Sequence, residues 1–199
     1  MELTAKFFLT ATLVFSLSAC VVGNQIGHSG QDASVTFGNV RVLDGNNAGH
    51  LNAVNGNIEI GKNAKVKYAE TTNGNIYLGD GSRAMGLETV NGNIDAGSNA
   101  TIDGQIRTVN GDITIGTQTQ VAENLVTTNG DVRLFSQVVI QGDIIFEDSG
   151  MSSFIKLEDQ TLEISDGAIL EGRVILYKPV RLQLPANFDK NKIVTHFER

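Results

Sequence analysis

The sequence predicts an all-β chain that folds as a single-stranded parallel β-helix, a solenoid with about 18–19 residues per coil. Three observations predict this fold: an Asn-Gly pair that recurs at fixed spacing, apolar residues at strand spacing after each pair, and prolines confined to the end of the chain. Self-similarity with a short fixed period is typical of solenoids, in which each repeat forms one turn.

Residues 1–19 are predicted to be a signal peptide. Lys6 and the free amine make a weakly basic start, and an apolar run follows over residues 7–15, interrupted only by Thr10 and Thr12. This run is about half of the roughly 20 apolar residues that a membrane-spanning helix needs, so it indicates a targeting segment that is cleaved.

The residues that follow indicate the type of cleavage. Leu17-Ser18-Ala19-Cys20 resembles the lipobox of bacterial type II signal peptides, in which small residues precede a cysteine that is thioether-linked to diacylglycerol. Cys20 is the only cysteine in the chain, so it cannot form an internal disulfide. The resemblance implies a lipoprotein whose acyl chains on Cys20 hold it on a membrane. Val21 is not the aspartate that retains such proteins at the inner membrane, which favours the outer membrane of the cell envelope.

The lipidated N-terminus is expected to lead into a flexible tether over residues 20–34, which are polar, contain glycine and lack periodicity. The β-helix is predicted over residues 35–184. Its Asn-Gly pairs are spaced by 18, 18, 19 and 19 residues, and in the first copy Ile58 and Ile60 follow Asn55 at strand spacing. Asn-Gly also favours two-residue hairpins, but an antiparallel meander would not need the same side chains at each period. Stacked coils would need them, because each residue then lies about 4.8 Å above its equivalent in the preceding coil and like side chains meet.

Stacking arranges equivalent residues in columns along the axis. The asparagines are predicted to form a structural ladder of side-chain amides, while each following glycine supplies positive φ at a tight corner. The members of this ladder are Asn55, Asn73, Asn91, Asn110 and Asn129. A threonine column lies two positions earlier, at Thr71, Thr89, Thr108 and Thr127, and its hydroxyls could chain in the same way. The neighbouring valines, such as Val90, compete for the interior, and the sequence leaves the orientation of these two columns open.

The C-terminal tail, residues 185–199, is predicted to cap the solenoid. Pro179 and Pro185 are the only prolines, so no residue of the repeats lacks the N–H that coil-to-coil ladders require. The open end of a β-helix exposes strand edges, and the tail mixes Phe188, Ile193 and Phe197 with charged residues. Such a segment is suited to cover those edges.

The repeats also carry a family resemblance. The recurrent NGNI and NGDI pieces resemble adhesin-like proteins with Asn-Gly-rich β-helical repeats, a domain family of unknown function. The QGDI and EGRV pieces near residues 141 and 171 resemble bactofilins, the polymer-forming bacterial β-helix proteins. The resemblance covers roughly residues 50–180 and implies the fold more than a function, since β-helices host unrelated activities.

Two acidic columns are the candidates for chemistry. Glu70 and Glu88 fall in one column with Arg107, and a glycosidase would need two such carboxylates about 5 to 10 Å apart. Asp112 and Asp131 fall in another, where oxygen ligands would suit calcium. The favoured interpretation of both is structural: a solvated ladder relieved by Arg107, and aspartates that replace asparagine at a corner. No catalytic residue, metal ligand or cofactor is therefore predicted, and the three histidines are dispersed in sequence.

Composition excludes nucleic acid as a partner. The chain has 15 Lys and Arg against 22 Asp and Glu, a formal charge of −7, and no basic stripe that could release counterions from phosphate. The expected function is a non-enzymatic, membrane-anchored structural or adhesive surface that binds an envelope protein, a glycan or further copies of the chain. The alternative is a carbohydrate-active β-helix, but only 6% of residues are aromatic and none is Trp, which is poor for stacking sugars.

Overall fold

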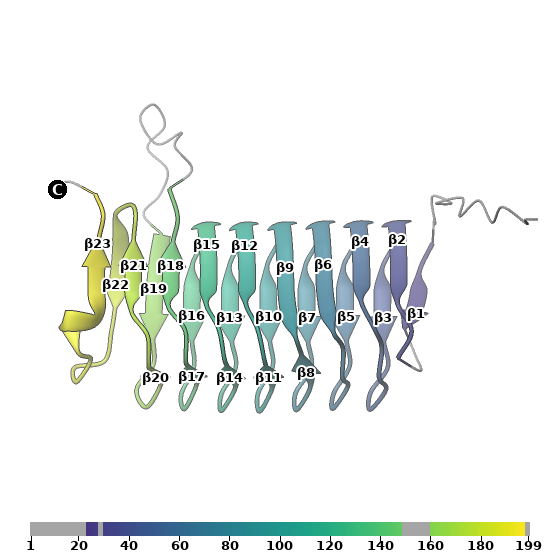
Figure 1. Cartoon of the computed structure of the whole chain (residues 1–199), viewed down its shortest axis with the longest axis horizontal. Coiled ribbons are helices and arrows are strands. Elements are labelled where there is room, and N and C mark those ends of the chain that lie inside the picture. Colours follow the sequence, from purple (N-terminus) through teal and green to yellow (C-terminus); the bar gives the residue numbers. More distant parts are fainter. Residues whose placement is uncertain (1–22, 28–29, 149–159, 198–199) are drawn as a thin grey trace, which may run out of the picture.

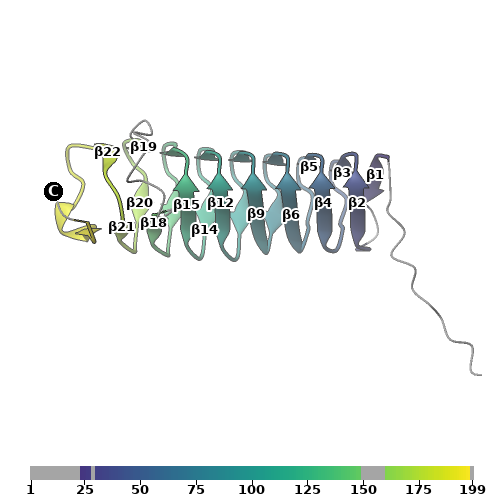
Figure 2. The same ribbon diagram turned by 90° about the horizontal axis from the view of Figure 1, so that it is seen from above.

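The computed structural model describes residues 23–27, 30–148 and 160–197. These residues form an elongated rod of stacked coils, in which each coil contributes one strand to each of two long parallel sheets and most contribute to a short third sheet (Figures 1 and 2). The chain is a parallel β-helix with about 19 residues per turn, as the repeats predict.

We call the three sheets A, B and C. Sheet A contains β2 (Ala33–Phe37), β4 (Leu51–Asn55), β6 (Tyr68–Asn73), β9 (Gly86–Asn91), β12 (Ile106–Asn110), β15 (Leu125–Asn129), β18 (Ile144–Phe146), β21 (Val174–Leu176) and β23 (Ile193–Thr195). Sheet B contains β1 (Gln25–Gly27), β3 (Val40–Val42), β5 (Ile58–Ile60), β7 (Ile76–Leu78), β10 (Ile94–Ala96), β13 (Ile113–Ile115), β16 (Val132–Leu134), β19 (Gln160–Ile164) and β22 (Val180–Gln183). Sheet C contains β8 (Arg83–Ala84), β11 (Thr101–Ile102), β14 (Gln120–Val121), β17 (Val139–Ile140) and β20 (Ile169–Leu170). A short 3-10 helix, η1 (Lys190–Lys192), precedes β23.

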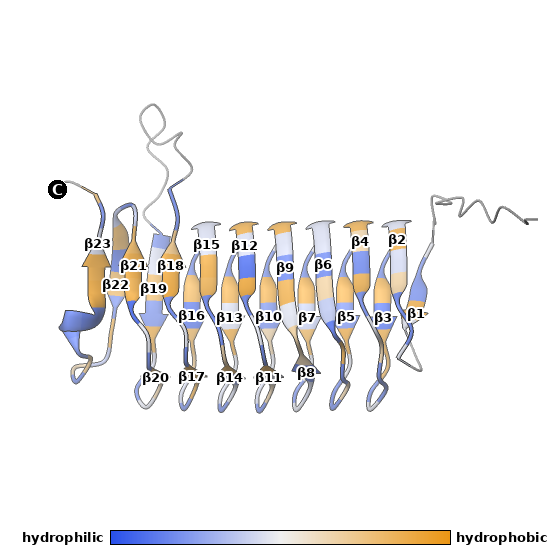
Figure 3. Cartoon of the chain, in the orientation of Figure 1, coloured by the Kyte–Doolittle hydropathy of each residue, from blue (hydrophilic) through white to orange (hydrophobic). Residues whose placement is uncertain are grey.

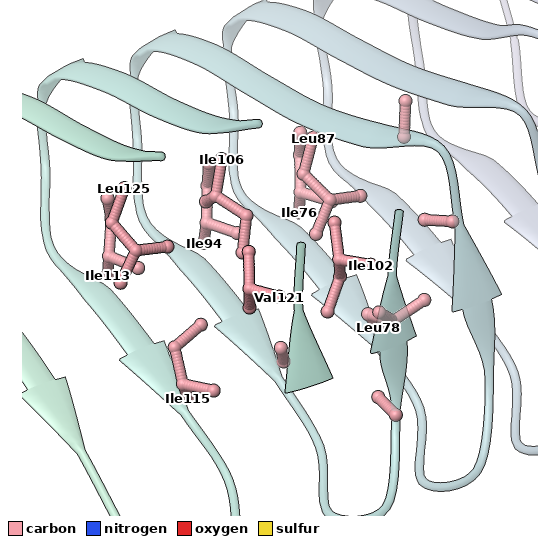
Figure 4. Close-up of a cluster of buried hydrophobic side chains, with 14 of the residues drawn as sticks. Ile76, Leu78, Leu87, Ile94, Ile102, Ile106, Ile113, Ile115, Val121 and Leu125 are labelled. Carbon is pink, nitrogen blue, oxygen red and sulfur yellow. The ribbon is translucent and has the colours of Figure 1, made fainter. Parts of the chain in front are cut away.

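The strand register is the one that the repeat predicts. Ile94 pairs with Ile76 on one side and with Ile113 on the other, and all three side chains are fully buried. Along sheet A the same holds for Leu87, Ile106 and their equivalents, so the core is a set of apolar columns that meet inside the coil (Figure 4). Figure 3 shows the apolar positions on the strands and the polar positions on the corners. Burial of each column excludes water from the whole axis of the rod.

The threonine column faces inward, which resolves the orientation that the sequence left open. Thr89 and Thr108 are fully buried, whereas Val90 is 39% exposed. The buried hydroxyls do not chain to one another. Each donates to a backbone carbonyl at the corner of the preceding coil, as Thr89 Oγ1 does to Gly74 O at 2.9 Å. A buried hydroxyl needs such an acceptor, and the corner supplies one in every coil.

The coils begin earlier than the predicted boundary at residue 35. Strand β1 pairs with β3, so residues 25–27 belong to sheet B and not to a tether. Asn24 is already a corner residue of the first coil, because its Oδ1 accepts from the backbone N–H of Asn39 at 2.9 Å, as Asn39 Oδ1 accepts from Asn57 N in the next coil. Residues 20–22 and 28–29 of the predicted tether lie outside the described residues.

The tail does more than cover the end of the rod. Strand β23 pairs with β21, so the segment predicted as a cap contributes the last strand of sheet A. Phe188, Ile193 and Phe197 pack against the core from this segment. Residues 149–159, which the sequence assigned to the β-helix, lie outside the described residues.

Candidate functional site

The Asn-Gly pairs lie where the strands of sheet A end and the chain turns toward sheet B. Here the amides form the expected ladder: Asn91 Nδ2 donates to Asn73 Oδ1 at 2.9 Å, and Asn110 Nδ2 donates to Asn91 Oδ1 at 2.8 Å. The same bond joins Asn73 to Asn55 and Asn129 to Asn110. Most of these side chains are solvent-exposed, so the ladder runs along the outside of the rod.

The glycine column serves a different purpose from the one expected. Gly92 and Gly111 have φ of 159°, which is close to extended backbone, and the corner does not require a left-handed residue there. The requirement is space. A Cβ built on Gly92 would overlap the carbonyl oxygen of Gly74 one coil away, and the equivalent overlap occurs at Gly74, Gly111 and Gly130. Glycine is therefore needed because adjacent coils approach each other through bare backbone.

A second polar column follows two positions after the asparagines. Asn93 Oδ1 accepts from the backbone N–H of Asp112 at 2.9 Å, and Asp112 Oδ1 accepts from that of Asp131 at 2.8 Å. Asp131 in turn accepts from Thr161 N across the break at residues 149–159. Because the bonds from coil to coil in this column use only the acceptor oxygen Oδ1, aspartate can replace asparagine. In this geometry Asp112 and Asp131 accept the same coil-to-coil hydrogen bond as the asparagine that they replace. Among the described residues no three His, Cys, Asp or Glu side chains are grouped to hold a metal.

A third column was not predicted from the sequence. Left-handed residues occur at the corner after seven strands of sheet B, from β3 to β19, with φ between 55° and 81° at Gly45, Asn63, Gly81, Asn99, Gln118, Gln137 and Gly167. Glycine and asparagine tolerate this conformation, and two glutamines adopt it here. The sequence signal for these corners is a Gly or Asn that recurs with the period of the coils, but it is weak because the residue changes among Gly, Asn and Gln from coil to coil.

The Glu70, Glu88 and Arg107 column lies on the outer face of sheet A. It lines a shallow groove of about 210 Å³, together with Tyr68, Glu123 and the backbone of Gly86. Arg107 does not primarily relieve Glu88, whose Oε1 is 3.9 Å from the Arg107 Nε. Instead, Arg107 donates to both carboxylate oxygens of Glu147, at 2.8 and 3.2 Å.

This bidentate ion pair joins residues two coils apart. Val126 pairs with Arg107 on one side and with Ile145 on the other, so the bridge passes over β15. Val126, which lies beneath this bridge on the outer face of sheet A, is only 3% exposed. Glu147 also accepts from Thr128 Oγ1 at 3.2 Å. The arrangement holds three coils together and leaves Glu88 with only the longer approach to Arg107, at 3.9 Å.

The outer face of sheet B carries a partly buried carboxyl group. Asp95 lies between Tyr77 and Thr114 in the strand register. Burial raises the pKa of Asp95, the Asp112 charge raises it further, and a hydrogen bond with Thr114 opposes both effects.

The two histidines that the structure describes do not lie together. His50 stacks on Tyr68 near the start of the rod, with ring centroids 5.6 Å apart, and His196 stacks on Tyr177 at its far end, with centroids 4.8 Å apart. His28 lies outside the described residues.

Comparison of the chain with protein-family models, with curated proteins and with solved structures gives no match. Cys20 and the predicted signal peptide lie outside the described residues. Within the part of the chain that the structure describes, no helix is long and apolar enough to cross a membrane.

Proposed function

We propose that this protein is a lipoprotein of the bacterial envelope, anchored through Cys20, whose β-helix acts as a non-enzymatic binding surface. The anchor rests on the Leu-Ser-Ala-Cys sequence at residues 17–20 and the single cysteine. The observation that carries the binding role is a column of β-branched side chains on the outer face of sheet A. Its members are Thr36, Val54, Thr72, Val90 and Val109, each one position before a ladder asparagine or its equivalent, and the next position, Thr128, is buried.

This column is partly apolar. Val54 and Val90 are 40% and 39% exposed, although the fold has an apolar interior in which the valines could have been placed. The strands that carry them lie side by side with a regular spacing (Figure 2). A row of exposed apolar side chains on a rigid sheet favours contact with another macromolecule. We infer that an envelope protein, a glycan or a further copy of the chain lies along this face.

The binding proposal is tested with two matched variants of the full chain. Val90→Lys places a charge on the outer face of sheet A, and Thr114→Lys places one on the outer face of sheet B. Envelope preparations are cross-linked, and the partners of the wild type and of each variant are captured. We expect Val90→Lys to lose the wild-type partner and Thr114→Lys to keep it, with unchanged circular dichroism for both. Capture of the same partner by Val90→Lys would contradict the assignment of this face.

The second candidate function is that of a carbohydrate-active β-helix. The groove at Tyr68, Glu70 and Glu88 favours it, because an aromatic ring and two carboxylates on neighbouring coils lie together. We expect the purified protein to show no hydrolase or lyase turnover on common polysaccharides. Reproducible turnover that Glu88→Gln abolishes would replace the binding proposal with the enzymatic one.

A further inference from the structure

The amide ladder ends at Asn129, and the column that it follows continues through the next two coils. Thr127 pairs with Phe146, and Phe146 pairs with Leu176. Two positions after these residues come Asn129, Asp148 and Lys178. The same column that stacks asparagines in earlier coils therefore presents a carboxamide, a carboxylate and an amine in succession.

Lys178 reaches back past the strand β18 to the end of β15. Its Nζ lies 3.4 Å from Asn129 Oδ1 and contacts the carbonyl oxygen of Thr128. The Lys178 side chain is buried, which is unusual for lysine. Asn129 Cγ is bonded to the oxygen that Lys178 Nζ approaches, so the amine and the carbonyl carbon of the amide are brought together in a site of restricted solvent access.

The surroundings shift this amine toward its neutral, nucleophilic form. Burial disfavours the ammonium ion and lowers the pKa of Lys178, while the charge of Asp148 acts in the opposite direction. Asp148 is thus close enough to influence the amine electrostatically. A carboxylate in this place can accept a proton from the attacking nitrogen and deliver it to the leaving nitrogen.

We propose that Lys178 and Asn129 form an intramolecular isopeptide bond. The Lys178 Nζ bonds to Asn129 Cγ, the bond from Cγ to Nδ2 breaks, and ammonia leaves. The proton lost by Nζ passes through Asp148 to the departing nitrogen, so the step needs no oxidant, reductant or added reactant. The departing Nδ2 is the atom that donates to Asn110 Oδ1 at 2.9 Å, so one ladder hydrogen bond is replaced by a covalent bond.

The bond would join residues 49 positions apart and enclose the segment that interrupts the repeat. A cross-link of this kind restricts the unfolded chain and holds the last coils on the rod when one end is pulled. Such a clamp suits a rod that bears load between a membrane anchor and a bound partner.

Peptide mapping of the full chain tests the proposal. Trypsin should release residues 108–133, which hold Asn129, and residues 174–181, which hold Lys178 before a proline that blocks cleavage. We expect one branched peptide whose mass is the sum of the two minus one ammonia molecule. Two separate linear peptides from the wild-type chain would overturn the proposal, whether or not any variant folds.

Variants then assign the roles. Lys178→Arg and Asn129→Ala should each give only the linear peptides. Lys192→Arg is the matched control, because Lys192 Nζ also contacts backbone carbonyls, those of Leu170 and Glu171, without taking part in the proposed bond. This control should keep the branched peptide. Asp148→Ala should slow formation of the bond in freshly made protein, and formation at the wild-type rate would remove Asp148 from the mechanism.

Discussion

Replacing Gly92 by alanine tests the steric account of the glycine column. The added Cβ would overlap the carbonyl oxygen of Gly74, and the backbone around it has little freedom to move. Gly74 N donates to Asn91 O at 3.0 Å and Gly92 N donates to Asn110 O at 2.9 Å, so separating the coils would stretch the ladder on both sides. Overpacking of this kind typically costs about 1–3 kcal/mol. For a chain of this size, a loss of about 2 kcal/mol lowers the Tm by roughly 4–8 °C.

The assay is urea and thermal unfolding of the purified variant, followed by circular dichroism. Gly45→Asn is the matched control. Gly45 has φ of 70°, a conformation that asparagine tolerates, and an added Cβ would meet no heavy atom within 4 Å. Asn63 occupies the equivalent corner one coil later with φ of 55°. The free energy of unfolding of Gly45→Asn should therefore differ from that of the wild type by less than about 0.5 kcal/mol.

Gly92→Asn separates the steric explanation from a conformational one. If the column needed glycine only to form a left-handed corner, asparagine would be the best-tolerated replacement. The overlap with Gly74 predicts instead that Gly92→Asn is at least as unstable as Gly92→Ala, because both add a Cβ in the same place. A Gly92→Asn protein with the wild-type Tm would refute the steric reasoning.

Three other substitutions test the core, the ladder and the partly buried carboxyl group. Ile94→Asp should prevent folding or lower the Tm far more than Asp95→Lys, because it buries an unpaired charge in a dry column; equal effects in a thermal melt would rule out the stacked core. Asn91→Ala removes two exposed amide hydrogen bonds and should destabilise the protein by about 1 kcal/mol in urea, whereas a stable variant that loses its partner would make the ladder a binding site. Asp95→Asn should be more stable than the wild type at neutral pH. The pKa of Asp95 in the folded protein lies above the unfolded value of 3.8, so the wild type loses stability relative to the variant as the pH rises through the folded pKa. The free energies of unfolding of the two proteins should therefore converge below pH 3.8, and a difference that widens on acidification would contradict this prediction.

The sequence predicted the coil length, the register and the amide ladder because the Asn-Gly pair repeats with little variation. It could not orient the threonine column, since threonine and valine both suit a strand and alternate along it. The structure distinguishes them through the hydroxyl: Thr89 has an acceptor inside the coil, at Gly74 O, and valine needs none. The sequence analysis also gave the wrong reason for the glycines of the Asn-Gly pairs, which it assigned to positive φ. A close approach between coils and a left-handed corner both select glycine, so the sequence alone does not distinguish them.

The long-range contacts on the outside of sheet A were beyond the sequence. Arg107 and Glu147 are 40 residues apart, and Lys178 and Asn129 are 49 apart. The equivalent corner residues Asp143 and Arg173 are 30 residues apart, so the coil that includes residues 149–159 breaks the period of 18 or 19. Once the period is lost, repeat spacing no longer shows which residues share a column.

Metabolic labelling with a fatty-acid analogue tests the central claim most directly. Cells producing the full chain are labelled, and the protein is purified from the membrane fraction. The account predicts that the wild type carries the label and that Cys20→Ala carries none and remains uncleaved or unlipidated. A wild-type protein that takes up no label would contradict the assignment of residues 17–20 as a lipidation site and remove the membrane anchor from the proposed function.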